Sequence, residues 1–171
     1  MKWGNSTATG LGVPGRKKRQ SPPASFDWRD SNMVTRVKDQ GGKDIDSNQY
    51  NFFRCLGCSS CWAFAAAAVA ESAIANNNGG LTDLSPEQLV DCRTDDGNGC
   101  DPGYPSKALE NIRKNGVATW SNYPYVAGSG QAGSCQAQSN GAVFISSWTD
   151  EGADESQLTT ALYNNGPLVY G

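Results

Sequence analysis

The segment that most constrains the fold of this chain is an alanine-rich run from Cys61 to Ala75. Alanine has the highest helix propensity of all residues, and Ser60 is a suitable N-cap for a helix that begins at Cys61. The run is apolar on almost every side, so we predict a helix that is buried at the centre of a domain. Three asparagines and two glycines at 76–80 end it.

Two further helices are predicted from their start and stop signals. Ser85 caps the first, which covers about 86–91 and opens with a proline, and Gln88 is placed to complete a capping box. The second covers about 106–115, and Gly116 ends it. Its apolar face consists of Ala108, Leu109 and Ile112.

The remaining elements are short. We predict extended segments at 26–28 and 34–37, a strand at 142–145, a helix at 157–163 and the beginning of a strand at 168–170.

Composition excludes several classes of function. The chain has 171 residues, 37% hydrophobic and 18% charged, which is typical of a globular protein with a sizeable core. A net charge of −3 argues against a general role in binding nucleic acid or anionic membranes. No stretch approaches the ~18 apolar residues of a membrane-spanning helix. The N-terminus has no signal-peptide core, so we expect a cytosolic protein or a true start further upstream.

Cys61 lies in the first turn of the predicted central helix. The macrodipole and free N–H groups of a helix N-terminus favour thiolate, the nucleophilic form of cysteine. A nearby imidazolium normally completes the activation and protonates the leaving group, but the 171 residues include no histidine. On spacing alone, a buried thiol or half of a disulfide fits Cys61 equally well.

The six cysteines indicate an oxidising compartment or a metal site. Cys55, Cys58 and Cys61 have the C-x2-C-x2-C spacing of a ferredoxin run, so a metal or iron–sulfur module is an alternative. The C-x3-C-P continuation of that run is absent and an alanine-rich helix follows, which disfavours it. The other cysteines are Cys92, Cys100 and Cys135.

The residues around Cys61 favour a different class. Cys58-Ser59-Ser60-Cys61-Trp62-Ala63-Phe64 resembles the active-site segment of the papain-like cysteine proteases, the cathepsin group. The resemblance covers about 23–171, with further family motifs in the right order. They are Ala-Ser-Phe-Asp-Trp-Arg at 24–29, Val-Lys-Asp-Gln-Gly at 37–41, Leu-Ser-Pro-Glu-Gln-Leu-Val-Asp-Cys at 84–92, Gly-Cys-Asp-Pro-Gly-Tyr-Pro at 99–105, Asn-Tyr-Pro-Tyr at 122–125 and Gly-Pro at 166–167.

The resemblance implies an α+β, papain-like two-domain fold. The helical left domain would be essentially complete, and the β-barrel-like right domain only begun. We accordingly assign 1–22 to a propeptide remnant or disordered lead-in, 23–147 to the N-terminal segment and helical domain, and 148–171 to the start of a truncated β-barrel-like domain. The basic run at 16–19 fits a protease processing site and a solvated tail equally well.

The resemblance also implies roles for single residues. Cys61 would be the nucleophile, and Gln40 would donate its amide to the oxyanion beside the backbone N–H of Cys61. Gly103 would pair with the substrate backbone. Tyr104 and Pro105 would wall the pocket for the second residue before the scissile bond.

By the same resemblance, the chain would be a cysteine endopeptidase that hydrolyses peptide bonds through an acyl-enzyme on Cys61. It would be made as a zymogen in a lysosomal or extracellular setting. Its partners would be peptide or protein substrates and cystatin-like inhibitors, with no nucleic acid, membrane, metal or cofactor. Ser59 would border a second substrate pocket. The implied disulfides are Cys58–Cys100 and Cys92–Cys135, with Cys61 free.

Two departures from the family pattern concern whole segments. The catalytic histidine and asparagine of the family lie about 130–150 residues after the nucleophile. Only 110 residues follow Cys61 in this chain of 171, so we expect this polypeptide to be inactive. Residues 42–56, with Cys55, separate Gly41 from Gly57. They are a gene-model artefact or a genuine loop, and the insertion could displace Gln40.

Two departures concern single residues. Ser59 replaces a glycine, which costs roughly 1 kcal/mol or more if the position requires a positive φ. Pro102 stands where glycine is usual, which removes an N–H and fixes φ. A non-catalytic truncated paralogue with a binding or regulatory role fits the same sequence. A histidine encoded downstream in the same frame would favour the enzyme.

Overall fold

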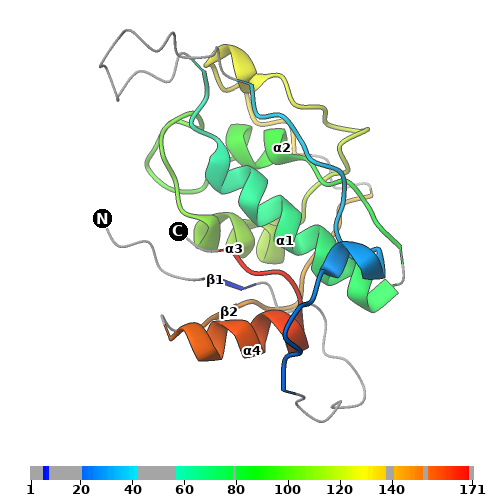
Figure 1. Ribbon diagram of the computed structural model, residues 1–171. Coiled ribbons are helices and arrows are strands. Elements are labelled where there is room, and N and C mark those ends of the chain that lie inside the picture. The colour runs from blue at the N-terminus through cyan, green and yellow to red at the C-terminus, as the bar shows by residue number, and fades with distance from the viewer. Residues whose placement is uncertain are drawn as a thin grey trace, which may run out of the picture.

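The architecture is helix-rich, with little strand in the part of the chain that is described. The computed structural model describes residues 6–7, 21–41, 57–78, 80–137, 141–151 and 154–169. None of the helices there is both long and apolar enough to cross a membrane. The elements are β1 (Ser6–Thr7), η1 (Trp28–Ser31), α1 (Cys61–Asn78), α2 (Pro86–Asp91), α3 (Pro105–Asn115), η2 (Ala127–Ser129), β2 (Thr149–Asp150) and α4 (Glu155–Asn165) (Figure 1).

Helix α1 is the centre of the core, as its apolar sequence predicts. It begins at Cys61 and ends at Asn78, slightly beyond the predicted end. Most of its alanines are buried because α2 and α3 pack against it, and small side chains allow helices to approach closely. The largest fully buried apolar side chains of the core are Leu84, Leu89, Leu109 and Ile112.

Of the two predictions for the start of α2, the Ser85 side-chain cap is confirmed and the capping box is not. The Ser85 side chain accepts a hydrogen bond from the Gln88 N–H at 3.0 Å, and a proline occupies the first turn. The capping box is wrong, because the Ser85 N–H donates to the Ala118 carbonyl at 2.9 Å instead of to Gln88. The Gln88 amide accepts from the Ala118 N–H at 2.8 Å and donates to the Gly116 carbonyl at 3.4 Å. Gln88 therefore ties α2 to the segment that follows α3.

Helix α3 confirms its prediction almost to the residue. It begins at Pro105, one residue before the predicted start, because proline is favoured in the first helical turn. Gly116 ends the helix with a φ of 73°, a left-handed value that glycine adopts without strain. The predicted apolar face of Ala108, Leu109 and Ile112 is buried.

The extended predictions are less accurate. Trp28 opens the η1 helix because the Asp27 carboxylate caps it, accepting from the Arg29 N–H at 2.8 Å. The predicted strand at 142–145 forms only an isolated bridge between Val143 and Val117. Strands β1 and β2 are antiparallel, with Ser6 opposite Asp150.

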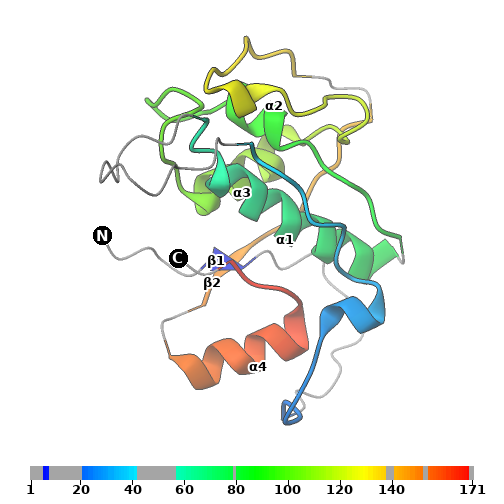
Figure 2. The ribbon, with the colours of Figure 1, turned by 45° about the horizontal axis from the view of Figure 1, so that its top comes forward.

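The predicted helix at 157–163 is longer than expected. Asp154 caps α4 by accepting from the N–H groups of Ser156 and Gln157. Helix α4 lies apart from the three-helix core of α1, α2 and α3 in both views (Figures 1 and 2). Several predictions fall wholly or partly outside the described residues: the insertion at 42–56, the basic run at 16–19 and the strand that begins at 168–170.

The segment 21–41 connects α4 to the core, running from beside α4 up along α1 (Figure 1). The Trp28 indole N–H donates to the Leu162 carbonyl at 2.8 Å. Phe26 packs edge-on against Tyr163, with ring centroids 4.8 Å apart. The far end of the segment, which contains Gln40, packs against Gly128.

Candidate active site

Cys61 is an exposed, free thiol at the first residue of α1. Its neighbours Ser60 and Trp62 are buried, with 0% and 4% of their surface exposed. Within the first turn of α1, the Ser60 carbonyl accepts hydrogen bonds from the N–H groups of Ala63 at 2.9 Å and Phe64 at 3.2 Å. A buried thiol and a disulfide partner are thus both excluded for Cys61.

Two disulfides connect the segments around Cys61. They are Cys58–Cys100 and Cys92–Cys135, the two pairs that the family resemblance implies. Because Cys58 is paired, it cannot serve as a ligand of an iron–sulfur cluster. Across the first disulfide, the Ser59 N–H donates to the Cys100 carbonyl at 3.0 Å. The start of α1 is therefore fixed to the loop that leads to Gly103.

Gly103 lies directly against the indole ring of Trp62. A Cβ atom on Gly103 would stand 2.7–2.9 Å from three ring atoms, closer than any side chain allows. The Trp62 indole N–H donates to the Asp101 carbonyl at 3.2 Å. The backbone of this loop is consequently held against the residue that follows Cys61.

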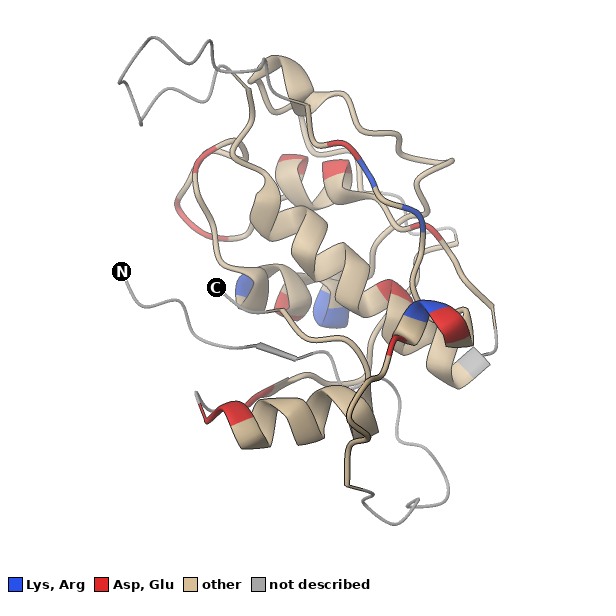
Figure 3. Cartoon of the chain, in the orientation of Figure 1, with Lys and Arg blue, Asp and Glu red and all other residues tan. Residues whose placement is uncertain are grey.

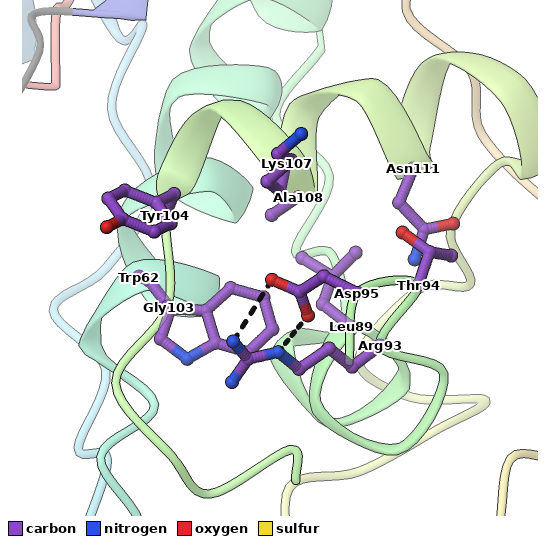
Figure 4. A pocket seen from close by; sticks show the side chains of 10 residues that line it. All are labelled: Trp62, Leu89, Arg93, Thr94, Asp95, Gly103, Tyr104, Lys107, Ala108 and Asn111. Atoms are coloured by element: carbon purple, nitrogen blue, oxygen red, sulfur yellow. Dashed lines mark hydrogen bonds and ion pairs between the residues drawn. The ribbon is translucent and has the colours of Figure 1, made fainter. Parts of the chain in front are cut away.

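Tyr104 and Pro105 form the junction between this loop and α3. Tyr104 is the N-cap of the helix and is half exposed, and Pro105 is its first residue. Figure 4 shows Gly103 and Tyr104 beside the Trp62 indole. The helix start thereby fixes the orientation of the loop edge near the thiol.

Gln40 lies in a segment whose backbone packs against Gly128. Gly41 has a φ of 71°, and a Cβ on it would stand 2.9 Å from the Cα of Gly128. The ring of Tyr125 also lies next to Gly128, and its hydroxyl is 2.8 Å from Oγ of Ser60. The segment that holds Gln40 is thus linked, through the loop 125–128, to the residue that precedes Cys61.

A buried ion cluster fixes the same segment to α1. Lys38 Nζ lies 2.8 Å from Oε2 of Glu71 and 3.0 Å from Oδ1 of Asp83. The other Glu71 oxygen accepts from the Leu84 N–H at 2.7 Å, and the Thr35 hydroxyl donates to Oε2. The side chains of Lys38 and Glu71 are only 7% and 0% exposed.

Nearby positive charges and burial have opposite effects on the pKa of Asp83. Burial raises the pKa of Asp83, but the hydrogen bonds and charges of Lys38 and Arg36 outweigh it and hold the pKa below its usual value. Sequence reasoning missed this cluster. Its signal was Glu71, the single charge within the apolar run, visible as the one acidic band on α1 in Figure 3.

Glu87 on α2 is hydrogen-bonded to the backbone of residues 125–128. It is fully buried, and its Oε2 accepts from the N–H groups of Val126 at 2.9 Å and Ala127 at 3.0 Å. Its Oε1 has no hydrogen-bond partner among the described residues. Burial raises the pKa of Glu87 above its usual value, and the two backbone hydrogen bonds offset this only in part. Sequence reasoning missed this residue too.

The two single-residue departures are tolerated locally. Among the described residues, Asn32 is the one non-glycine residue with a positive φ, so Ser59 carries none of the strain considered for it. Pro102 is exposed, and its carbonyl accepts a hydrogen bond from Arg93 at 3.3 Å. No cluster of three potential metal-ligating side chains occurs in the part of the chain that the structure describes.

Comparison with known proteins gives a family. The family model described as papain family cysteine protease matches residues 22–171. Cysteine endopeptidase RepA of Oryza sativa subsp. japonica is 39% identical over 149 residues, which cover 86% of this chain and 35% of that protein. The cathepsin L-like proteinase of Phaedon cochleariae is 35% identical over 149 residues, which cover 85% of this chain and 40% of that protein.

A solved structure agrees with the sequence relatives. Digestive procathepsin L 3 of Tenebrio molitor larval midgut superposes with a TM-score of 0.66 at 31% identity, covering 95% of this chain and 47% of that one. The chain spans less than half the length of each of these relatives. The predicted papain-like fold class is confirmed, with a helical domain and little strand among the described residues. The chain belongs to the papain family of cysteine proteases.

Proposed function

We propose that this chain contributes the nucleophile and substrate-binding edge of a papain-like cysteine endopeptidase. The observation that carries the proposal is the exposed, free Cys61 thiol at the start of α1, next to a loop whose Gly103 lies against Trp62. Reactive cysteines lie in partly exposed, electropositive places, and a helix N-terminus is one of them.

In the proposed reaction, the Cys61 thiolate attacks the carbonyl carbon of a peptide bond. The C–N bond breaks, the amine leaves with a proton, and water hydrolyses the resulting thioester. The backbone N–H of Cys61 and the amide of Gln40 would stabilise the oxyanion. These 171 residues contain no histidine, so none of them is the histidine that would act as general base and move these protons.

The substrate would bind as an extended strand. Gly103 would exchange backbone hydrogen bonds with it, because a residue without a side chain lets another backbone approach closely. Tyr104 and Pro105 would wall the pocket for the second residue before the scissile bond, and Ser59 would border the adjacent one. Tyr104 is half exposed, so part of its surface faces this edge of the molecule.

The biological setting is proposed on the same basis. Residues 23–147 would form the N-terminal segment and helical domain, and 148–171 would begin the second domain. Residues 1–22 would be a propeptide remnant or a disordered lead-in, and 42–56 an insertion. The two disulfides support a lysosomal or extracellular location. Cystatin-like proteins would be inhibitors.

A second candidate is a non-catalytic peptide-binding protein, since Gly103 and Tyr104 would bind a peptide without any catalytic group. The test is peptide hydrolysis by the whole protein and by its Cys61→Ala variant, with Cys55→Ser as the matched cysteine control. The proposal expects loss of hydrolysis in Cys61→Ala alone. Peptide binding without hydrolysis in the unaltered whole protein would favour the second candidate.

A further inference from the structure

Arg93 lies inside the loop that leads from α2 to Gly103. Its side chain is only 10% exposed, and its guanidinium donates to the backbone carbonyls of that loop. Nη1 donates to Asn98 at 2.9 Å and to Asp101 at 3.0 Å, and Nη2 donates to Pro102 at 3.3 Å. One side chain thus holds three carbonyls in the five residues before Gly103.

The guanidinium is itself fixed in place by the loop. The Asp95 carboxylate accepts from both Nε and Nη2 of Arg93, a bidentate pair that sets the plane of the guanidinium (Figure 4). Gly97 passes so close that a Cβ on it would stand 2.6 Å from the guanidinium carbon. The loop therefore wraps around Arg93 and has no space for another side chain there.

The same guanidinium contacts the residue next to the thiol. Its central carbon lies 5.3 Å from the centroid of the Trp62 ring, within range of a cation–π interaction. The Asp101 carbonyl accepts from both Arg93 and the Trp62 indole N–H. Trp62 consequently contacts Arg93 on the one hand and Gly103 on the other.

We propose that Arg93 is a positioning residue for peptide binding, which fixes the Gly103 edge relative to Cys61. The inference rests on the proposed function. The loop from Cys92 to Tyr104 has no regular secondary structure, so the carbonyls of Asp101 and Pro102 need donors other than those of a helix or sheet. Arg93 supplies them from a planar group that also stacks on Trp62. Lysine cannot reproduce this, because its ammonium is a point charge.

A preformed edge lowers the entropy that peptide binding would otherwise cost. Loss of Arg93 should therefore weaken recognition of the peptide and leave the reactivity of the thiol itself unchanged. This separates a positioning role from a purely structural one, in which both would change together.

The experiment compares two alkylating reagents on the 171-residue chain. A dipeptidyl chloromethyl ketone carries a peptide backbone, whereas iodoacetamide does not, and both form a bond to Cys61 Sγ as the halide leaves. The chains are the unaltered protein, Arg93→Lys, Arg93→Gln and the control Arg113→Gln, whose residue pairs with Glu110 on the exposed side of α3. Far-UV circular dichroism establishes folding, and if Arg93→Gln does not fold, Arg93→Lys carries the test.

We expect the peptidyl reagent to react more slowly with both Arg93 variants by roughly tenfold, about the effect of one hydrogen bond to a charged group. The change should lie in the concentration for half-maximal rate. The rates with iodoacetamide, and both rates of Arg113→Gln, should be unchanged. Hydrogen exchange of the Trp62 indole N–H should be faster in Arg93→Lys.

Two results would overturn the inference alone: an unchanged peptidyl rate in both Arg93 variants, or an equal loss with both reagents. If the unaltered chain reacts no faster with the peptidyl reagent than with iodoacetamide, the proposed function fails and the inference fails with it.

Discussion

The hydroxyl of Tyr125 lies 2.8 Å from Oγ of Ser60, the fully buried residue that immediately precedes Cys61. This hydrogen bond joins the start of α1 to the loop against which Gly41 packs. The segments that carry Cys61 and Gln40 are therefore linked through Tyr125 and Gly128, in addition to the buried ion pair of Lys38 and Glu71.

Tyr125→Phe should lower the free energy of unfolding by about 1–3 kcal/mol, because it leaves the Ser60 hydroxyl buried without this partner. Urea unfolding measures the change. The double variant Tyr125→Phe/Ser60→Ala removes both partners and should recover much of the loss. Equal stability of the single and double variants would show that the contact contributes little.

Breaking the buried pair of Lys38 and Glu71 should cost far more. Glu71→Ala leaves the Lys38 ammonium buried beside Asp83 alone, and losing one partner of such a pair costs about 3–5 kcal/mol. Chemical denaturation measures this. Arg113→Ala, which breaks the exposed pair with Glu110, is the matched control and should change stability little. Similar losses in the two variants would contradict the role given to burial.

Gly103→Ala should disturb the substrate edge more than the fold. Its new methyl group would overlap the Trp62 ring, and overpacking of this kind costs about 1–3 kcal/mol. We expect peptide-directed alkylation of Cys61 to slow while alkylation by iodoacetamide continues at its usual rate. Gly80→Ala is the control, since a Cβ there meets nothing within 4 Å. Normal peptidyl labelling of Gly103→Ala would remove Gly103 from the proposed edge.

Glu87 should make the protein more stable at acid pH. Its pKa is raised by burial, so the folded state binds the proton more tightly than the unfolded state does. The stability that this provides is fully present below the unfolded value of 4.5, and it is lost as the pH rises through the folded pKa. Glu87→Gln keeps an oxygen for the N–H groups of Val126 and Ala127 but carries no charge.

The Tm of Glu87→Gln should therefore exceed that of the unaltered chain at neutral pH, and the two should converge as the pH falls toward 4.5. A thermal unfolding series across this range measures the difference. Parallel curves for the two proteins would mean that Glu87 does not titrate with folding.

The sequence signals that succeeded are local ones. Each signal acts on residues only a few positions away from it, so it predicts a helix directly. Examples are the apolar run of α1, the Ser85 cap and the Gly116 stop. The capping-box prediction failed because Ala118, distant in sequence, takes the place of Gln88. Glu87 went unrecognised for the same reason, since its partners are the N–H groups of Val126 and Ala127, which only the fold brings near. The carbonyl partners of Arg93 lie within nine residues of it, but they belong to an irregular loop, which no periodic pattern predicts.

For the candidate active site, too, the sequence predicts the residues but not the contacts between distant segments. Family motifs predicted that Cys61, Gln40 and Gly103 belong together, but motifs do not show what holds them. The link from Gly41 through Gly128 and Tyr125 depends on packing between segments more than 80 residues apart. No periodicity in the sequence reports such contacts.

The most direct test of the central proposal is to find which residue a peptidyl acyloxymethyl ketone labels in the native protein, by mass spectrometry of its proteolytic peptides. We predict a single modification on Cys61, slowed by an excess of a competing peptide and absent from Cys61→Ala. Labelling of another cysteine, or labelling of Cys61 that a competing peptide does not slow, would contradict the assignment of Cys61 as the nucleophile.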